Sequence, residues 1–252
     1  MNKCYVSIVS HGHDSLIIDN KELVAISSLD DVVVFIKDNI GSELLKNYCL
    51  EQSYIYLDTP KNIGFGCNNN VVFDSCCKNG MDDKDWFLVV NPDVTMTYDD
   101  FCLLRKNLEE ETNESLTINL FKSNSFVDVE NSLRYFPKVS SVLSAFLGKP
   151  INAAFDKNEL KNRDTVDWAS GAFLIFKCPL YRELSGFDSK YFMYFEDVDI
   201  CYRARYLRNQ PVTYLKHIRA VHAGAYANRN IFSIHFFWYL RSLLRFLLSS
   251  KK

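Results

Sequence analysis

The chain has 252 residues, of which 48% are hydrophobic and 24% charged. This excludes a disordered chain and leaves room for one large domain, or one domain with an appendage. Its net charge of −2 hides an asymmetry: the residues from Ile200 onward include ten Lys or Arg and no Asp or Glu, whereas the first 199 carry 19 basic and 31 acidic side chains. We therefore expect the basic C-terminal part to meet an anionic partner, and without a nucleic-acid recognition motif we favour phosphate groups or a lipid surface over nucleic acid.

The eight cysteines form no CxxC pair and no spaced zinc signature, and several lie in apolar runs where a free thiol behaves as a small hydrophobe. The first three residues lead directly into a strand-like apolar run, with no signal peptide before it. We therefore expect a protein of the reducing cytoplasm.

The N-terminal half alternates strand-like and helix-like segments. Short apolar runs predict strands at residues 4–10, 32–36, 54–57 and 86–90. Helical patterns lie between them at residues 14–26, 42–50 and 67–78. This alternation indicates a parallel sheet covered by helices on both faces, with ligands bound beyond the carboxyl ends of its strands.

Three polar segments follow predicted strands and fall at that ligand-binding edge. They are Ser10-His-Gly-His13, Lys37-Asp-Asn39 and Asn91-Pro-Asp93. An Asp in the third segment is placed to hold a Mg²⁺ or Mn²⁺ that bridges a diphosphate, because hard cations take oxygen ligands. An Asx or proline turn also explains these residues, and the segment by itself favours the turn over a metal site.

The segment Asn62-Ile-Gly-Phe-Gly66 joins a predicted strand to a predicted helix. Its glycines let a backbone approach a ligand closely, and a helix N-terminus favours phosphate. The alternative is a plain helix-entry turn capped by Asn.

The second half is less regular. We expect a helix at residues 98–111, strands at 116–121 and 173–176, a helix from Asp197 to Arg208 and a short last strand at 212–215. The segment Asp167-Trp-Ala-Ser-Gly171 precedes one of these strands. Trp168 is suited to stack on a sugar or base, or equally to be buried at the start of the strand.

The run Tyr191-Phe-Met-Tyr-Phe-Glu-Asp-Val-Asp199 places three carboxylates behind four aromatic side chains, where a helical pattern begins. Acidic residues favour a helix N-terminus, so capping accounts for Asp197 or Asp199. Capping does not explain the aromatic wall, which favours a carboxylate that takes a proton or faces a cation. Further on, His222 is a lone histidine in an acid-free region.

Residues 231–248 contain thirteen apolar residues out of eighteen, together with two arginines. The arginines disfavour a membrane-spanning helix. A helix lying in a membrane interface and a helix packed on the domain's own core remain two equal alternatives.

Taken together and in this order, the motifs resemble family 2 of the inverting glycosyltransferases, in its rhamnosyltransferase-like branch. The motifs that carry the resemblance are Val6-Ser-Ile-Val-Ser10, Lys37-Asp-Asn39, Asn62-Ile-Gly-Phe-Gly66, Asn91-Pro-Asp93, Asp167-Trp-Ala-Ser-Gly171, Gly186-Phe-Asp188, Phe192-Met-Tyr-Phe-Glu-Asp197 and His222. The resemblance implies an α/β GT-A fold at residues 1–226, with a nucleotide-binding half at 1–96 and an acceptor half at 97–226. Residues 227–252 would form a basic, aromatic helix that anchors the protein to a membrane surface.

The resemblance also implies roles for individual residues. Asp93 and His222 would hold Mg²⁺ or Mn²⁺, with Asn91 replacing the first acid of the family's DxD motif. Asp197 would be the general base, with Glu196 beside it. The donor would contact Ser10, Asp38, Asn39, Asn62, Gly64, Asn91, Trp168 and Gly171.

These roles describe inverting, metal-assisted transfer of L-rhamnose from dTDP-rhamnose to a polyprenyl-diphosphate-linked sugar during O-antigen assembly at the inner leaflet. UDP-galactofuranose or a UDP-hexose is an alternative donor, and a non-catalytic sugar-nucleotide-binding module is an alternative function. A nucleotidyltransferase is disfavoured, because only one glycine, Gly12, follows the first strand where a glycine-rich phosphate loop would lie.

Overall fold

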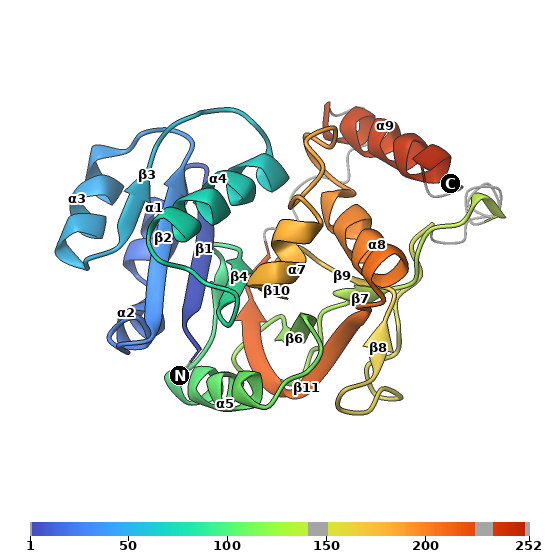
Figure 1. The fold of residues 1–252 in the computed structure, drawn as a ribbon, viewed down its shortest axis with the longest axis horizontal. Coiled ribbons are helices and arrows are strands. Elements are labelled where there is room, and N and C mark those ends of the chain that lie inside the picture. The colour runs from blue at the N-terminus through green and yellow to red at the C-terminus, as the bar shows by residue number, and fades with distance from the viewer. Residues whose placement is uncertain (1, 141–150, 225–233, 250–252) are drawn as a thin grey trace.

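A computed structural model describes residues 2–140, 151–224 and 234–249 (Figure 1). The helices are α1 (Asp14–Ile18), α2 (Lys21–Ser27), α3 (Glu43–Glu51), α4 (Phe65–Lys78), α5 (Tyr98–Glu109), α7 (Cys178–Glu183), α8 (Glu196–Arg208) and α9 (Ile234–Ser249). The strands are β1 (Cys4–Ser10), β2 (Val32–Asp38), β3 (Ile55–Leu57), β4 (Trp86–Val90), β5 (Val94–Thr95), β6 (Ser115–Phe121), β7 (Leu133–Arg134), β8 (Thr165–Val166), β9 (Trp168–Ala169), β10 (Phe173–Lys177) and β11 (Val212–His222).

The central sheet has the strand order β3-β2-β1-β4-β10-β6-β11-β5, with β8 paired to β11. The first four strands are parallel, as the alternating sequence pattern predicts. The rest of the sheet is mixed, because β10 runs antiparallel to both β4 and β6. A parallel partner needs a crossover helix, and the regular strand–helix alternation ends after β4.

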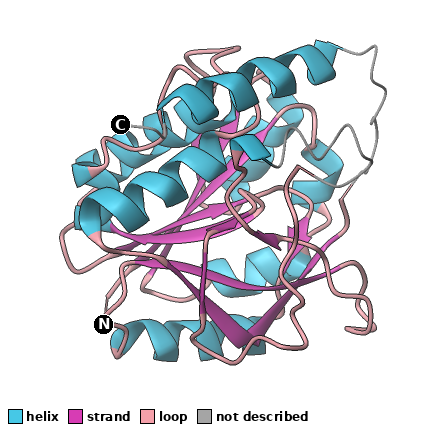
Figure 2. Cartoon of the chain, turned by 90° about the vertical axis from the view of Figure 1, so that its right-hand side faces the viewer, coloured by secondary structure: helices cyan, strands magenta, loops and turns pink. Residues whose placement is uncertain are grey.

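Helices lie on both faces of this sheet (Figure 2). The buried apolar side chains form two clusters. Successive side chains of a strand point to opposite faces, so Tyr5 belongs to one cluster and Val6 to the other. The helices α4, α7, α8 and α9 contribute to the first cluster, and α2, α3 and α5 to the second. The parallel strands β1 and β4 are buried on both faces, as their nearly continuous apolar sequence predicts.

Two predicted boundaries are wrong for identifiable reasons. The expected single helix at residues 14–26 is two helices, because the Asn20 side chain accepts a hydrogen bond from the Leu23 amide and starts α2 anew. The expected short strand at 212–215 continues to His222, with a register shift between Leu215 and Arg219.

Helix α9 lies against α8 at the top of Figure 1. The Phe246 ring is buried 5.9 Å from Phe195 and 5.5 Å from Tyr202, measured between ring centroids. Four side chains on the opposite side of α9 are exposed: Phe237, Leu240, Leu244 and Leu248. The helix is thus packed on the core and also carries an uncovered apolar face. Within the described ranges, no helix has the length and apolar character needed to cross a membrane.

Candidate active site

A cleft of about 800 Å³ opens where β1, β2 and β4 end. Six of the residues predicted for the site line it: Asn39, Asn62, Gly64, Asn91, Asp93 and His222. These residues come from four separate segments of the chain, and the topology brings them together because parallel strands end at one edge of the sheet.

Asp93 and His222 meet because the short strand β5 pairs with the end of the long strand β11. β5 runs antiparallel to the end of β11, so that His222 is the partner of Val94 and the amide of Ala223 donates to the Asp93 carbonyl at 3.0 Å. This register places His222 Nε2 3.3 Å from Asp93 Oδ1. The Asn91 carbonyl accepts from the Val94 amide at 3.1 Å, so the expected turn is also present.

A second carboxylate faces the other side of the same imidazole. Glu130 Oε2 lies 2.8 Å from His222 Nδ1, and both side chains are largely buried. Burial lowers the pKa of His222, but the hydrogen bonds and charges of Asp93 and Glu130 outweigh it and raise the pKa to about 9. Burial raises the pKa of Asp93, but the bond from His222 brings the net pKa below its usual value.

This arrangement fits a divalent cation. A metal-binding histidine typically donates its second ring N–H to a carboxylate, which fixes the tautomer and orients the ring. A bond from Nδ1 to Glu130 would leave Nε2 free to bind an ion together with Asp93. No larger group of His, Cys, Asp and Glu suited to a metal occurs within the described ranges. Two protein ligands are sufficient when substrate phosphates and water supply the others, as is usual for Mg²⁺.

The predicted acidic pair lies at the start of α8. The two residues before it, Tyr194 and Phe195, both adopt left-handed backbone conformations with φ of 67°. Such conformations cost about 1–3 kcal/mol each for non-glycine residues and are maintained by the surrounding structure. Here they turn the chain sharply, so that Glu196 and Asp197 begin the helix directly after the aromatic run.

The two carboxyl groups have different environments. Burial, followed by the adjacent Asp197, raises the pKa of Glu196 to about 8, and Glu196 Oε2 has no hydrogen-bond partner. Burial also raises the pKa of Asp197, but the amides of Gly171 and Val198 donate to its carboxylate at 3.1 and 2.8 Å and oppose that shift. At neutral pH the proton shared by this pair therefore favours Glu196, and the charge favours Asp197.

Asp197 is partly exposed but is not among the residues that line the cleft. Its side chain and the ring of Phe65, which does line the cleft, border the same space next to Gly171: a Cβ on Gly171 would be 3.1 Å from the Phe65 ring and 3.7 Å from Asp197 Cβ. A larger side chain at Gly171 would therefore fill the space between the acid and the cleft wall.

The glycine motif at residues 62–66 serves close packing. Gly64 begins α4 with φ of 83°, and a Cβ there would lie 2.1 Å from the Phe192 carbonyl oxygen. The motif thus docks against the loop that leads into the acidic pair. The expected Asn cap is wrong, because Gly64 is the N-cap and has no side chain to accept from the amides of the first turn.

Three residues predicted to contact the donor are buried, and their side chains already form hydrogen bonds within the protein. Asp38 accepts from the amides of Ile40, Gly41 and Ser42 and from the Tyr56 hydroxyl. The hydroxyl of Ser10 accepts from the His13 amide. The Trp168 indole donates to the Tyr135 carbonyl, in agreement with the simpler expectation of a buried Trp. None of the three lines the cleft, so their contact with a donor stays a prediction.

His11 and His13 line the cleft, as expected of a segment placed at the ligand-binding edge, although no role was assigned to either. Other residues of the site were not predicted. Glu130 lies in an irregular segment whose sequence gives no indication of its contact with His222. His235 and Trp238 come from α9, so the helix expected to be a separate appendage forms part of the cleft wall.

No family model matches the chain. Among curated proteins, it is 33% identical over 248 residues to the rhamnosyltransferase WbbL of Escherichia coli, covering 96% of this chain and 92% of that protein. It is also 25% identical over 182 residues to the low-salt glycan biosynthesis hexosyltransferase Agl10 of Haloferax volcanii, covering 71% of this chain and 55% of that protein.

Solved structures share the fold at low sequence identity. The mannosyltransferase PcManGT from Pyrobaculum calidifontis, solved with GDP-Man and Mn²⁺, aligns with a TM-score of 0.62 at 11% identity, over 98% of this chain and 64% of that one. S. aureus TarS 1-349, solved with UDP, aligns with a TM-score of 0.56 at 13% identity, over 87% of this chain and 60% of that one. The chain therefore spans less than two thirds of these two structures, and the likeness establishes a GT-A fold.

Proposed function

Because this chain belongs to family 2 of the inverting glycosyltransferases, in the rhamnosyltransferase-like branch, we propose that it transfers L-rhamnose from dTDP-rhamnose to a polyprenyl-diphosphate-linked sugar. The protein is a glycosyltransferase; the donor, the ion and the acceptor are the proposed parts. The observation that carries the proposal is the 3.3 Å approach of His222 Nε2 to Asp93 Oδ1 inside the cleft.

Asp93 and His222 would hold the divalent ion, and Glu130 would orient the imidazole. The ion would neutralise charge that develops on the departing diphosphate. A nitrogen ligand favours Mn²⁺ over Mg²⁺, because Mg²⁺ is bound almost entirely through oxygen. The structure of PcManGT was determined with Mn²⁺.

Asp197 would accept the proton of the acceptor hydroxyl. A carboxylate within hydrogen-bond reach removes that proton as attack develops. Its neighbour Glu196 is buried and protonated near neutral pH, so Glu196 adds no second negative charge beside the reacting oxygen. A single attack from the face opposite the diphosphate inverts the anomeric carbon.

The proposed location is the cytoplasmic face of the inner membrane, where lipid-linked acceptors are exposed. The apolar outer face of α9 supports this location, because aromatic and basic residues together suit a membrane interface.

The test is a donor screen with purified protein, Mn²⁺ or Mg²⁺ and a lipid-linked N-acetylglucosamine analogue, read by mass spectrometry. We expect a deoxyhexose mass gain from dTDP-rhamnose. Asp197→Asn should lower kcat about 10²- to 10⁴-fold while the donor Kd is unchanged. The matched control is Asp199→Asn, which removes a carboxylate two residues further along α8 that pairs with Arg203 at 2.7 Å.

Each other outcome has a distinct meaning. Transfer from UDP-galactofuranose or a UDP-hexose would keep the mechanism and replace the donor. Tight nucleotide binding without transfer from any donor would contradict the proposal and favour a non-catalytic sugar-nucleotide-binding module. Equal losses in Asp197→Asn and Asp199→Asn would reject Asp197 as the base.

A further inference from the structure

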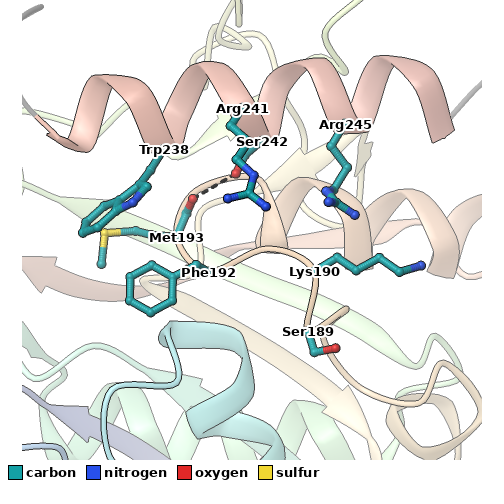
Figure 3. Close-up of a pocket in the computed structure, with 8 residues that line it drawn as sticks. All are labelled: Ser189, Lys190, Phe192, Met193, Trp238, Arg241, Ser242 and Arg245. Atoms are coloured by element: carbon teal, nitrogen blue, oxygen red, sulfur yellow. Dashed lines mark hydrogen bonds between the residues drawn. The ribbon is translucent and has the colours of Figure 1, made fainter.

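A second cavity, of about 570 Å³, lies between α9 and the loop that precedes α8 (Figure 3). Arg241 and Arg245 extend from α9 toward that loop, and Lys190 approaches from the loop below them. We call this cavity the basic pocket. The Ser242 hydroxyl donates to the Met193 carbonyl at 3.1 Å and fixes the helix to the loop at the pocket's centre.

The three cations of this pocket form no close ion pair with an acid in the part of the chain that the structure describes. Within the described ranges, no carboxylate pairs with Lys190, Arg241 or Arg245 at 4.0 Å or less. Two acids lie near Lys190 without forming an ion pair with its side chain: Asp188 accepts from the Lys190 backbone amide, and Asp199 pairs with Arg203.

The two arginines are four residues apart on α9, a spacing at which like charges repel. Helix α9 contains no acidic residue that would relieve this repulsion. Arginine is well suited to bidentate contacts with phosphate oxygens, and two arginines with a lysine match a diphosphate.

The basic pocket adjoins the cleft. Phe192, Met193 and Trp238 line both cavities, so single side chains separate them. The cleft holds the Asp93–His222 pair that we propose for the donor diphosphate, so the basic pocket lies directly beside the proposed donor site.

The same arginines also border the apolar outer face of α9. A third, open groove is lined by Phe237, Leu240, Leu244 and Leu248 together with Arg241 and Arg245. Of these apolar side chains, Leu248 is 74% exposed and Phe237 59% exposed. Arginines between an apolar face and a polar pocket are placed to reach phosphates at a bilayer surface.

We propose that the basic pocket binds the diphosphate of the lipid-linked acceptor. Lys190, Arg241 and Arg245 would hold the diphosphate, the prenyl chain would follow the outer face of α9 into the bilayer, and the attached sugar would enter the neighbouring cleft. This proposal rests on the proposed function, because it names how the same enzyme recognises its acceptor.

Direct binding tests the pocket independently of transfer. Farnesyl diphosphate is titrated into the full chain without donor or metal, and Trp238, which lines the pocket, reports binding by fluorescence. We expect the double variant Arg241→Gln/Arg245→Gln to bind about 100-fold more weakly, since each charge-assisted contact contributes about tenfold. The matched control is Lys46→Gln/Lys106→Gln, which removes two exposed positive charges elsewhere and should change the Kd less than about twofold.

A loop variant guards against a folding artefact. Lys190→Gln leaves α9 intact and should weaken binding about tenfold, with an unchanged thermal melting curve. Wild-type affinity in both Lys190→Gln and the double arginine variant would overturn the proposal.

Vesicles separate a lipid-linked diphosphate from ordinary anionic headgroups. Phosphatidylcholine vesicles carry either undecaprenyl diphosphate or phosphatidylglycerol at equal negative charge. We expect wild-type protein to prefer undecaprenyl diphosphate, and the double arginine variant to lose that preference. Equal binding to both would refute a diphosphate-specific site. The protein could instead bind farnesyl diphosphate through its arginines and yet transfer sugar from no donor. That result would refute the proposed function and support the basic pocket as a diphosphate site.

Discussion

Replacing Glu196 by Gln is expected to stabilise the fold above about pH 5. Glu196 is 6% exposed, and burial followed by the charge of Asp197 raises its pKa from 4.5 to about 8. Between these two pH values the folded protein keeps the proton on Glu196 and the unfolded chain has released it. The free energy of unfolding must therefore fall as the pH rises through this interval.

The width of this pH interval determines how much stability the wild type loses. One pH unit corresponds to about 1.4 kcal/mol, so the loss of stability reaches about 4 kcal/mol at pH 8. Gln has the shape of the protonated acid and does not titrate. The variant should match the wild type near pH 4.5 and be about 4 kcal/mol more stable at pH 8, a rise of more than about 1 M in the urea midpoint.

Urea unfolding at pH 4.5 to 8.5, followed by tryptophan fluorescence, measures this difference. Glu110→Gln is the control, because it removes a carboxylate that is exposed. Its effect should be small at every pH. A Glu196→Gln variant that is no more stable than the wild type at pH 8, or one whose gain is the same at pH 5 and pH 8, would refute the reasoning.

Three further predictions concern the cleft and its walls. Glu130→Gln should weaken Mn²⁺ binding about 10- to 100-fold in calorimetry, with unchanged circular dichroism, because the carboxylate orients the metal-facing imidazole; wild-type affinity would contradict this. Gly64→Ala should lower the melting temperature far more than Gly80→Ala: both glycines have positive φ, but only Gly64 would place a Cβ against the Phe192 carbonyl. Phe246→Ala should cost about 3–5 kcal/mol in chemical unfolding, since the ring is 1% exposed; a cost below 1 kcal/mol would show that α9 is not packed on the domain.

The sequence predicted correctly those helices and strands whose limits depend on residues close together in the chain. The strands β1 and β4 have the predicted bounds because apolar runs buried on both faces leave little freedom in their limits. The helix ends near Ser42 and Thr97 follow from side chains that cap the first turn. The order of the motifs was sufficient to identify the family.

The parts that were missed depend on contacts between distant segments. Glu130 faces His222 only because an irregular segment folds over the end of β11, and nothing in its neighbouring residues indicates this. Likewise, the apolar pattern of α9 was compatible with either a membrane surface or the core. The pattern does not show that Trp238 reaches the cleft.

The β5–β11 pairing has a consequence for the order of folding. Asp93 belongs to the first half of the chain and His222 to the end of the sheet, so the pair forms only after β11 has docked. Contacts between residues so far apart along the chain form late, because the loop entropy must first be overcome. A newly synthesised chain would therefore gain its proposed metal-binding pair only when the whole sheet is complete. Because the ion would bind only the finished fold, it would shift the last folding step toward the native state.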